Sequence, residues 1–294
     1  MSVGPGLPAK SGAGHGIRCT NLSSGYLGTK VLDGVSFEVT EPAIYVVLGP
    51  NGAGKTTLFR TLAGILTPYE GSVTIDGEPI EQQSTRGRLH FLSTNDGIPD
   101  GLSVVEALRY YARALEASDQ DVERVLGLLE ISDLRDRFFS SLSTGQKKRV
   151  SIARIFLRDR EIYLLDEPTA NLDPKVASEI RDLILGLSRN KIVLYSSHNL
   201  YEARDIGRFV LAIKQGKVAF FGDIHEMKTT KYVVGVRAVG PVDALASVPK
   251  QGDYFVYELS GPEQVSTLIR DLESRGVRIR EVKEMGNPLE ELFA

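Results

Sequence analysis

The sequence predicts an α/β protein in which a parallel sheet carries a phosphate-binding loop, followed by a small α+β domain. Residues 44–48 form a short apolar run typical of a buried strand, and a glycine-rich segment, residues 49–57, follows it directly. A second apolar run, residues 162–165, ends in two carboxylates, and open α/β sheets bind ligands at such strand ends. After Gly222 a new set of strand and helix signals begins. A helix is predicted after the glycine-rich segment from the spacing of Leu58, Leu62, Ile65 and Leu66.

The glycine-rich segment fits the phosphate-binding pattern G-x-x-x-x-G-K-[ST]. Its glycines permit backbone angles that other residues resist, so successive N–H groups can curve around an anion. The N-terminus of the following helix adds partial positive charge. Lys55 is placed to reach the β- and γ-phosphates, and the Thr56 hydroxyl to bind Mg²⁺. The predicted triphosphate-binding residues are Gly49, Pro50, Asn51, Gly52, Ala53, Gly54, Lys55, Thr56 and Thr57.

Composition narrows the class of protein. The chain has 294 residues, 42% of them hydrophobic and 25% charged, and no apolar run approaches the roughly 20 residues that span a bilayer. The N-terminus lacks a signal-peptide pattern, and the single cysteine, Cys19, indicates a reduced intracellular thiol. A net charge of −3 argues against general nucleic-acid binding. We therefore expect a cytoplasmic protein that reaches a membrane only by docking on another polypeptide.

The first half of the chain predicts a leader and two subdomains. Residues 1–16 are rich in Gly, Pro, Ala and Ser and are predicted to be disordered. Short β-like stretches predict an antiparallel β subdomain, and two helices after residue 102 predict a helical subdomain, the first with Ser103 as N-cap and Glu106 as its capping-box partner. The predicted strands are residues 17–22, 31–39, 72–75 (closed by the turn Asp76-Gly77) and 89–92. The first predicted helix begins at Ser103, and the second spans residues 120–129.

The second half of the chain first alternates strands and helices, and after Gly222 its pattern becomes that of a small α+β domain. The predicted elements are a helix reaching about Leu157, a strand at 162–165, a helix at 174–188, a strand at 192–195, a hairpin at 208–222, strands at 232–239 and 254–259, a helix at 262–275, a strand at 277–282 and a helix at 288–293. We expect a nucleotide-binding domain over residues 17–225 and a small α+β domain over residues 226–294, joined by a linker near residues 223–231.

Three polar residues follow the two apolar strands. Asp166 can hold Mg²⁺, Glu167 can take a proton from an attacking water, and His198 can contact the γ-phosphate or orient Glu167. Taken singly, Glu167 could be an exposed acid and His198 a core imidazole. Their placement at strand ends beside a phosphate-binding loop favours catalysis.

Over about residues 17–225 the chain resembles an ATP-binding subunit of an ABC transporter. The motifs occur in the family's order: Walker A at 49–57, a signature-like LSTGQ at 142–146, Walker B at 162–167, a D-loop at 170–173 and the switch histidine His198. Tyr26 falls where the family has an aromatic side chain that stacks on adenine. The resemblance implies an ABC ATPase domain with a parallel-sheet core, an antiparallel β subdomain and a helical subdomain. It also implies two copies packed head to tail, each ATP lying between the phosphate-binding loop of one and Ser143, Gly145 and Gln146 of the other.

One position departs from the family pattern. The family usually carries a Gln after the strand at residues 89–92, where it touches Mg²⁺ and faces the membrane partner. Here Thr94, or alternatively Asn95, stands at that place. A threonine hydroxyl can still reach the metal, though less far than a glutamine side chain. The expected metal-binding residues are Thr56, Thr94 and Asp166, and the expected ATPase rate is reduced or dependent on a partner.

The C-terminal segments 277–282 and 287–293 resemble the tails of ABC exporter ATPases for drugs, antibiotics or sodium, which pair with a separate integral permease. The resemblance implies an exporter ATPase on the inner face of the cell membrane, with ATP and Mg²⁺ and without nucleic acid. The alternatives are an importer ATPase, a soluble ABC ATPase, a cassette that binds ATP without turnover, and a tail that serves only for dimerisation. The transported substrate is not encoded here, because the permease forms the pathway.

Overall fold

A computed structural model describes residues 16–94, 97–224, 232–239, 245, 247–259, 261 and 264–285 of the chain. The chain divides into two compact units, Met1–Ile224 and His225–Ala294, and each is described by itself. Apart from Gly16, the predicted leader at residues 1–16 lies outside the described residues.

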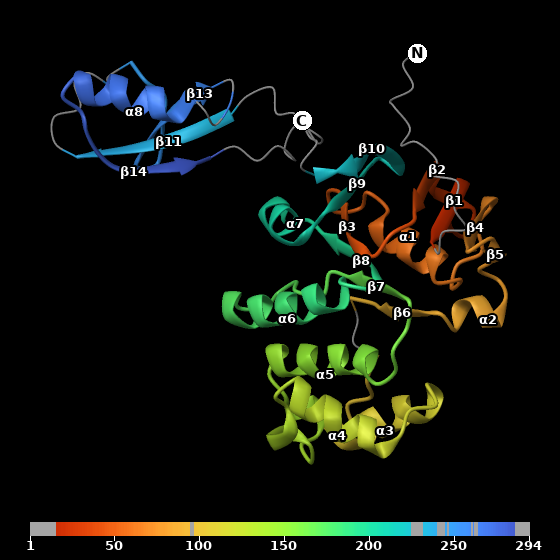
Figure 1. Cartoon of the computed structure of the whole chain (residues 1–294). Coiled ribbons are helices and arrows are strands. Elements are labelled where there is room, and N and C mark those ends of the chain that lie inside the picture. Colours follow the sequence, from red (N-terminus) through yellow and green to blue (C-terminus); the bar gives the residue numbers. More distant parts are fainter. Residues whose placement is uncertain are drawn as a thin grey trace. The chain divides into compact units, whose positions relative to one another are not determined.

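A six-stranded sheet forms the centre of the first unit (Figure 1). Its three central strands are buried at every position, which requires both faces of the sheet to be covered and explains their continuous apolar sequence. All neighbours in it run parallel except the final edge pair, β9 and β10. In order across the sheet, the strands are β10 (Lys217–Asp223), β9 (Phe209–Lys214), β3 (Ala43–Leu48), β8 (Ile192–Ser197), β7 (Ile162–Asp166) and β6 (Leu89–Leu92).

An antiparallel sheet lies beside this core, with the strand order β2-β1-β4-β5. The first strand extends to Tyr26, past the predicted end at residue 22, because Leu27 and Gly28 both adopt positive φ (49° and 82°) and turn the chain in two residues. The helix α1 packs against strands of both sheets within one apolar cluster (Figure 1). The bounds are β1 (Ile17–Tyr26), β2 (Thr29–Val39), α1 (Lys55–Leu62), β4 (Glu70–Ile75) and β5 (Glu78–Pro79).

The predicted helix after the glycine-rich segment is too long. Helix α1 ends at Leu62, and Ile65, predicted to lie on its apolar face, is 61% exposed. Gly64 has φ +67° and donates to the Thr61 carbonyl, while the Ile65 N–H donates to the Arg60 carbonyl. This pair of bonds is a Schellman motif, which needs a left-handed residue and favours glycine there.

Three helices form the helical subdomain, α3 (Val104–Ala114), α4 (Asp119–Leu128) and α5 (Thr144–Phe156), which lie together in Figure 1. The predicted capping box of Ser103 and Glu106 is confirmed at the start of α3. No helix in the described part of the chain combines the length and apolarity needed to cross a membrane. The remaining elements of this unit are α2 (Gln83–Arg86), 3₁₀ turns at Ser132–Leu134 and Phe139–Ser141, α6 (Pro174–Leu187) and α7 (Leu200–Ile206).

The described residues of the second unit form a four-stranded antiparallel sheet and one helix. Its apolar core joins Val236 and Phe255 of the sheet to Leu272 of the helix. The predicted final helix at residues 288–293 lies outside the described residues. Across the sheet the strands are β12 (Lys250–Gln251), β13 (Tyr254–Leu259), β11 (Tyr232–Val239) and β14 (Arg278–Glu284), and the helix is α8 (Val265–Ser274).

Two buried groups of the first unit are structural. Burial raises the pKa of the Cys19 thiol to about 12, so that it stays protonated and unreactive near neutral pH. Burial lowers the pKa of His90 to about 4, and its Nε2 lies 2.7 Å from the Arg158 carbonyl oxygen. The His90 ring is therefore neutral at pH 7 and packs as a core residue of β6.

Candidate functional site

The parallel strands bring four sequence segments to one edge of the sheet. The glycine-rich loop follows β3, and Thr94 comes shortly after β6. Strand β8 ends at Ser197 and is followed by His198, and strand β7 ends at Asp166 and is followed by Glu167. These strands are consecutive neighbours, so their carboxyl ends meet. The sheet edge where open α/β folds bind ligands is therefore lined by the residues predicted from sequence.

The glycines of the loop are required by its shape. Gly52 and Gly54 have φ of +80° and +108°, and Gly54 occupies the N-cap of α1 without a side-chain cap. A Cβ on Gly54 would lie 2.7 Å from Leu32 Cδ2, and one on Gly49 would lie 2.5 Å from the Ile213 carbonyl oxygen. The loop thus leaves the first N–H groups of α1 available to an anion, as a phosphate site needs.

The ammonium group of Lys55 lies over its own loop. Its Nζ donates to the carbonyl oxygens of Gly49 (2.7 Å) and Pro50 (3.3 Å), and Glu167 Oε1 lies 3.8 Å away. The side chain is only 6% exposed, and burial lowers the pKa of Lys55. Carbonyl partners only partly replace the water that this cation has lost, so a phosphate oxygen would be a better partner.

A carboxylate with three hydroxyl partners lies next to the loop. Asp166 is fully buried; its Oδ2 accepts from Thr56 (2.9 Å) and Thr94 (3.0 Å), and its Oδ1 accepts from Ser196 (2.6 Å). Mg²⁺ prefers oxygen ligands and is usually held in proteins by one or two carboxylates together with substrate phosphates. The donor set of Thr56, Thr94 and Asp166 fits that ion. Asn95, the alternative to Thr94, lies outside the described residues.

Glu167 is held in a sparsely populated backbone conformation, with φ +48°. Its N–H donates to Ser196 Oγ (2.9 Å), and Lys148 Nζ donates to its carbonyl oxygen (3.3 Å). Its side chain is 21% exposed, and His198 Nδ1 lies 3.4 Å from Oε1. The carboxylate therefore sits between a cation and an imidazole while still reaching solvent, where a general base can meet a water molecule.

Ser196 is a residue of the site that the sequence analysis did not identify. In the structure its hydroxyl contacts both Asp166 and the Glu167 backbone. A serine that directly follows the apolar run of β8 is the sequence signal that could have identified it, and the structure shows Ser196 to be fully buried.

Tyr26 lies at the end of β1 with 37% of its surface exposed. Its hydroxyl accepts a hydrogen bond from Arg60 (3.1 Å), whose guanidinium carbon is 6.0 Å from the ring centroid. Tyr26 therefore contacts the last turn of α1, and its partly exposed ring can stack on a base.

The signature residues lie at the start of α5. Ser143 Oγ accepts from the Gln146 N–H (3.3 Å) and Gln146 Oε1 accepts from the Ser143 N–H (3.0 Å). A Cβ on Gly145 would meet only Val176 methyl groups, at 3.8 Å and 3.9 Å, so this chain's own packing does not require glycine there. Among the described residues, no hydrogen bond joins this helix start to the glycine-rich loop.

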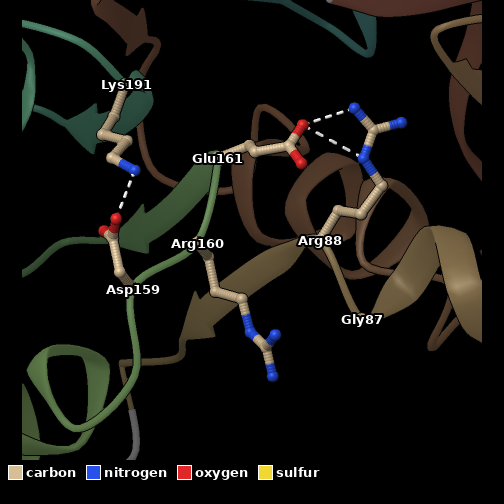
Figure 2. Close-up of a pocket in the computed structure, with 6 residues that line it drawn as sticks. All are labelled: Gly87, Arg88, Asp159, Arg160, Glu161 and Lys191. Carbon is tan, nitrogen blue, oxygen red and sulfur yellow. Dashed lines mark hydrogen bonds and ion pairs between the residues drawn. The ribbon is translucent and has the colours of Figure 1, made fainter.

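A pocket of about 210 Å³ lies at the opposite edge of the sheet (Figure 2). Its residues precede β6, β7 and β8, and two ion pairs form within it, Arg88 with Glu161 and Lys191 with Asp159. It is separate from the residues predicted by sequence. The lining residues are Gly87, Arg88, Asp159, Arg160, Glu161 and Lys191.

Comparison with known proteins identifies the family. Residues 32–170 match the family described as ABC transporter. A cytochrome c biogenesis ATP-binding export protein of Roseobacter denitrificans is 39% identical over 148 residues, which are 50% of this chain and 66% of that protein. A sulfate/thiosulfate import ATP-binding protein of Bradyrhizobium diazoefficiens is 32% identical, covering 74% of this chain and 68% of that protein.

A solved structure agrees with these relatives. The ATP-binding subunit of an ABC transporter superposes with a TM-score of 0.66 and 25% identity, covering 72% of this chain and 91% of that one. Together with the converging loop and carboxylates, these similarities show that the chain belongs to the ABC transporter family, as one of its ATP-binding ATPase proteins.

Proposed function

We propose that this ATPase hydrolyses Mg²⁺-ATP at the edge formed by β3, β8, β7 and β6, and that it energises export through a separate membrane permease. The observation that supports the site best is the convergence of Lys55, Asp166, Glu167 and His198. They come from three separate parts of the sequence, with Asp166 and Glu167 adjacent, and each has the chemistry that one component of ATP hydrolysis requires.

In this proposal each of these residues has one role. The loop N–H groups and Lys55 bind the phosphates, and Glu167 accepts a proton from the attacking water. His198 orients the Glu167 carboxylate, which it approaches to 3.4 Å. Thr56, Thr94 and Asp166 would hold Mg²⁺, which would neutralise phosphate charge. Tyr26 stacks on adenine, an interaction that contributes about 1–3 kcal/mol for any base.

A second copy completes each site in this proposal. Ser143, Gly145 and Gln146 of one chain approach the ATP bound to the loop of the other. Support comes from the 13-residue helix α5, whose first N–H groups can bind the γ-phosphate, and from the uncrowded Gly145. Because the triphosphate would join the two copies, hydrolysis would release them, and this difference in affinity can drive transport.

Export is favoured by the resemblance of segments 277–282 and 287–293 to exporter tails. Import stays the second candidate, because relatives of both kinds are similar to this chain. The test is purification of tagged full-length protein from detergent-solubilised membranes, with mass spectrometry of the associated polypeptides. We expect an integral permease without its own ATPase domain at the inner face of the cell membrane. Recovery only from the soluble fraction would favour a soluble ABC ATPase instead.

Thr94→Gln tests the departure from the family pattern. The Thr94 hydroxyl already contacts Asp166, so it lies beside the expected metal position. A glutamine there reaches further and supplies an oxygen of its own, and we expect the rate of ATP hydrolysis to rise several-fold. Steady-state turnover against Mg²⁺ concentration measures this, with Thr267→Gln, at an exposed position of α8 in the second unit, as control. An unchanged rate would show that this position does not limit turnover.

A further inference from the structure

A buried carboxylate lies behind the proposed site without touching any residue assigned to it. Glu202, on α7, has a side chain only 8% exposed. Its Oε1 accepts from Thr169 (2.6 Å) and Tyr195 (2.8 Å), and its Oε2 accepts from Ser197 (2.7 Å). Burying a carboxylate is costly unless it is paired and hydrogen-bonded, so these contacts account for its presence in the fold.

The partners of Glu202 come from both sides of the proposed site. Thr169 is two residues after Glu167, in the turn where the Ala170 N–H donates to the Glu167 carbonyl (3.3 Å). Ser197 directly precedes His198, and its Oγ also accepts from the Asn199 N–H (2.9 Å). Glu202 therefore connects the turn after Glu167 to the turn that carries His198.

A cation anchors the carboxylate from a third element. Arg181 Nη1 of α6 lies 3.5 Å from Glu202 Oε1. The start of α7 is fixed as well, because Asn199 Oδ1 accepts from the Tyr201 and Glu202 N–H groups. The position of Glu202 is thus set by its own helix and by α6, so it can act as a fixed point for the two turns.

The hydroxyl contacts around Oε1 are not equivalent. Thr169 Oγ1 and Tyr195 Oη also lie 2.7 Å apart, which gives three oxygen pairs among Thr169, Tyr195 and Glu202. The two hydroxyls carry one proton each, so only two of the three pairs are hydrogen bonds at one time. Removing the Thr169 hydroxyl leaves Tyr195 to donate to Glu202, whereas changing Glu202 disturbs both turns.

We infer that Glu202 is a positioning residue that holds Glu167 and His198 in register for hydrolysis. The inference rests on the proposed function of those two residues. Glu167 has a strained φ of +48°, and its contact with His198 is long, at 3.4 Å, so both need support from their surroundings. A displacement of about 1 Å at reacting groups can cost about a hundredfold in rate, and supporting partners typically matter about 10–100-fold.

The test compares full-length variants in steady-state ATP hydrolysis. We expect Glu202→Gln to lower kcat about tenfold, with KM for ATP within about twofold, because the glycine-rich loop is untouched. Thr169→Val should lower kcat about threefold, and the double variant should be no slower than Glu202→Gln, since both disturb one network. Asp159→Asn is the matched control: that carboxylate also accepts a tyrosine hydroxyl, from Tyr163 (3.2 Å), but at the opposite sheet edge.

Thermal unfolding of each variant separates positioning from general destabilisation. An unchanged kcat in Glu202→Gln would overturn the inference. The inference would also be overturned if Glu202→Gln lowered the unfolding midpoint and its loss of activity disappeared when the assay was run at a lower temperature. Glu167→Gln, assayed in parallel, separates failure of the proposed catalytic function from failure of the positioning role of Glu202. If Glu167→Gln keeps full turnover, the proposed catalytic function fails. If Glu167→Gln is inactive and Glu202→Gln is not impaired, only the role of Glu202 fails.

Discussion

Replacing Glu167 with Gln is expected to reduce ATP hydrolysis at least about a hundredfold while leaving ATP binding intact. A glutamine keeps the size and hydrogen-bonding reach of the side chain, so the left-handed turn at this residue should persist. It cannot accept a proton from water, and general-base catalysis contributes about 10²–10⁴-fold. The phosphate contacts of Lys55 and the loop are unaffected, so binding of a fluorescent ATP analogue should remain.

The same variant should accumulate a dimer in the presence of ATP, because the nucleotide that joins the two copies is no longer cleaved. Size-exclusion chromatography with light scattering at saturating Mg²⁺-ATP measures this directly. Glu161→Gln is the matched control, since it lies at the opposite end of β7 and should behave as the parent protein. A Glu167→Gln protein that stays monomeric, with or without its membrane partner, would contradict the two-copy arrangement.

Replacing Lys55 with Met is expected to weaken ATP binding at least about a hundredfold. The ammonium is the charged side chain closest to the loop carbonyls and is only 6% exposed, so its interaction with phosphate occurs largely away from solvent. Methionine preserves the apolar stem and removes the charge. Isothermal titration calorimetry with ATP measures the loss, and Lys147→Met on α5 is the control because that lysine lies outside the loop.

In the absence of nucleotide, Lys55→Met should not lower the thermal stability of the protein, although it weakens ATP binding. Burial lowers the pKa of Lys55, which means that the fold disfavours the charged form of this side chain relative to the unfolded chain. A neutral methionine removes that penalty, so the nucleotide-free unfolding midpoint should be equal to or above that of the parent. The stabilisation by added ATP should disappear. A marked fall of the nucleotide-free midpoint would show that the variant is misfolded and not merely unable to bind.

Local patterns in the sequence were sufficient for much of the fold. The three central strands were predicted because burial on both faces demands continuous apolar runs. The capping box at Ser103 was predicted because its two hydrogen bonds join residues three apart. Helix α7 and the short helix α2 were not predicted, and the end of α1 was misplaced because the left-handed Gly64 ends the helix before its apolar pattern does.

The sequence by itself determined the glycine-rich loop, Asp166, Glu167 and His198 as candidate site residues, because each is recognised from its immediate neighbours along the chain. Only the tertiary structure decided that Ser196 would hold Asp166 and Glu167, and that Glu202 would lie between the turns of Glu167 and His198. The order of the strands, with β8 between β3 and β7, makes these residues neighbours. That order arises from packing across the whole sheet, and no local pattern of residues encodes it.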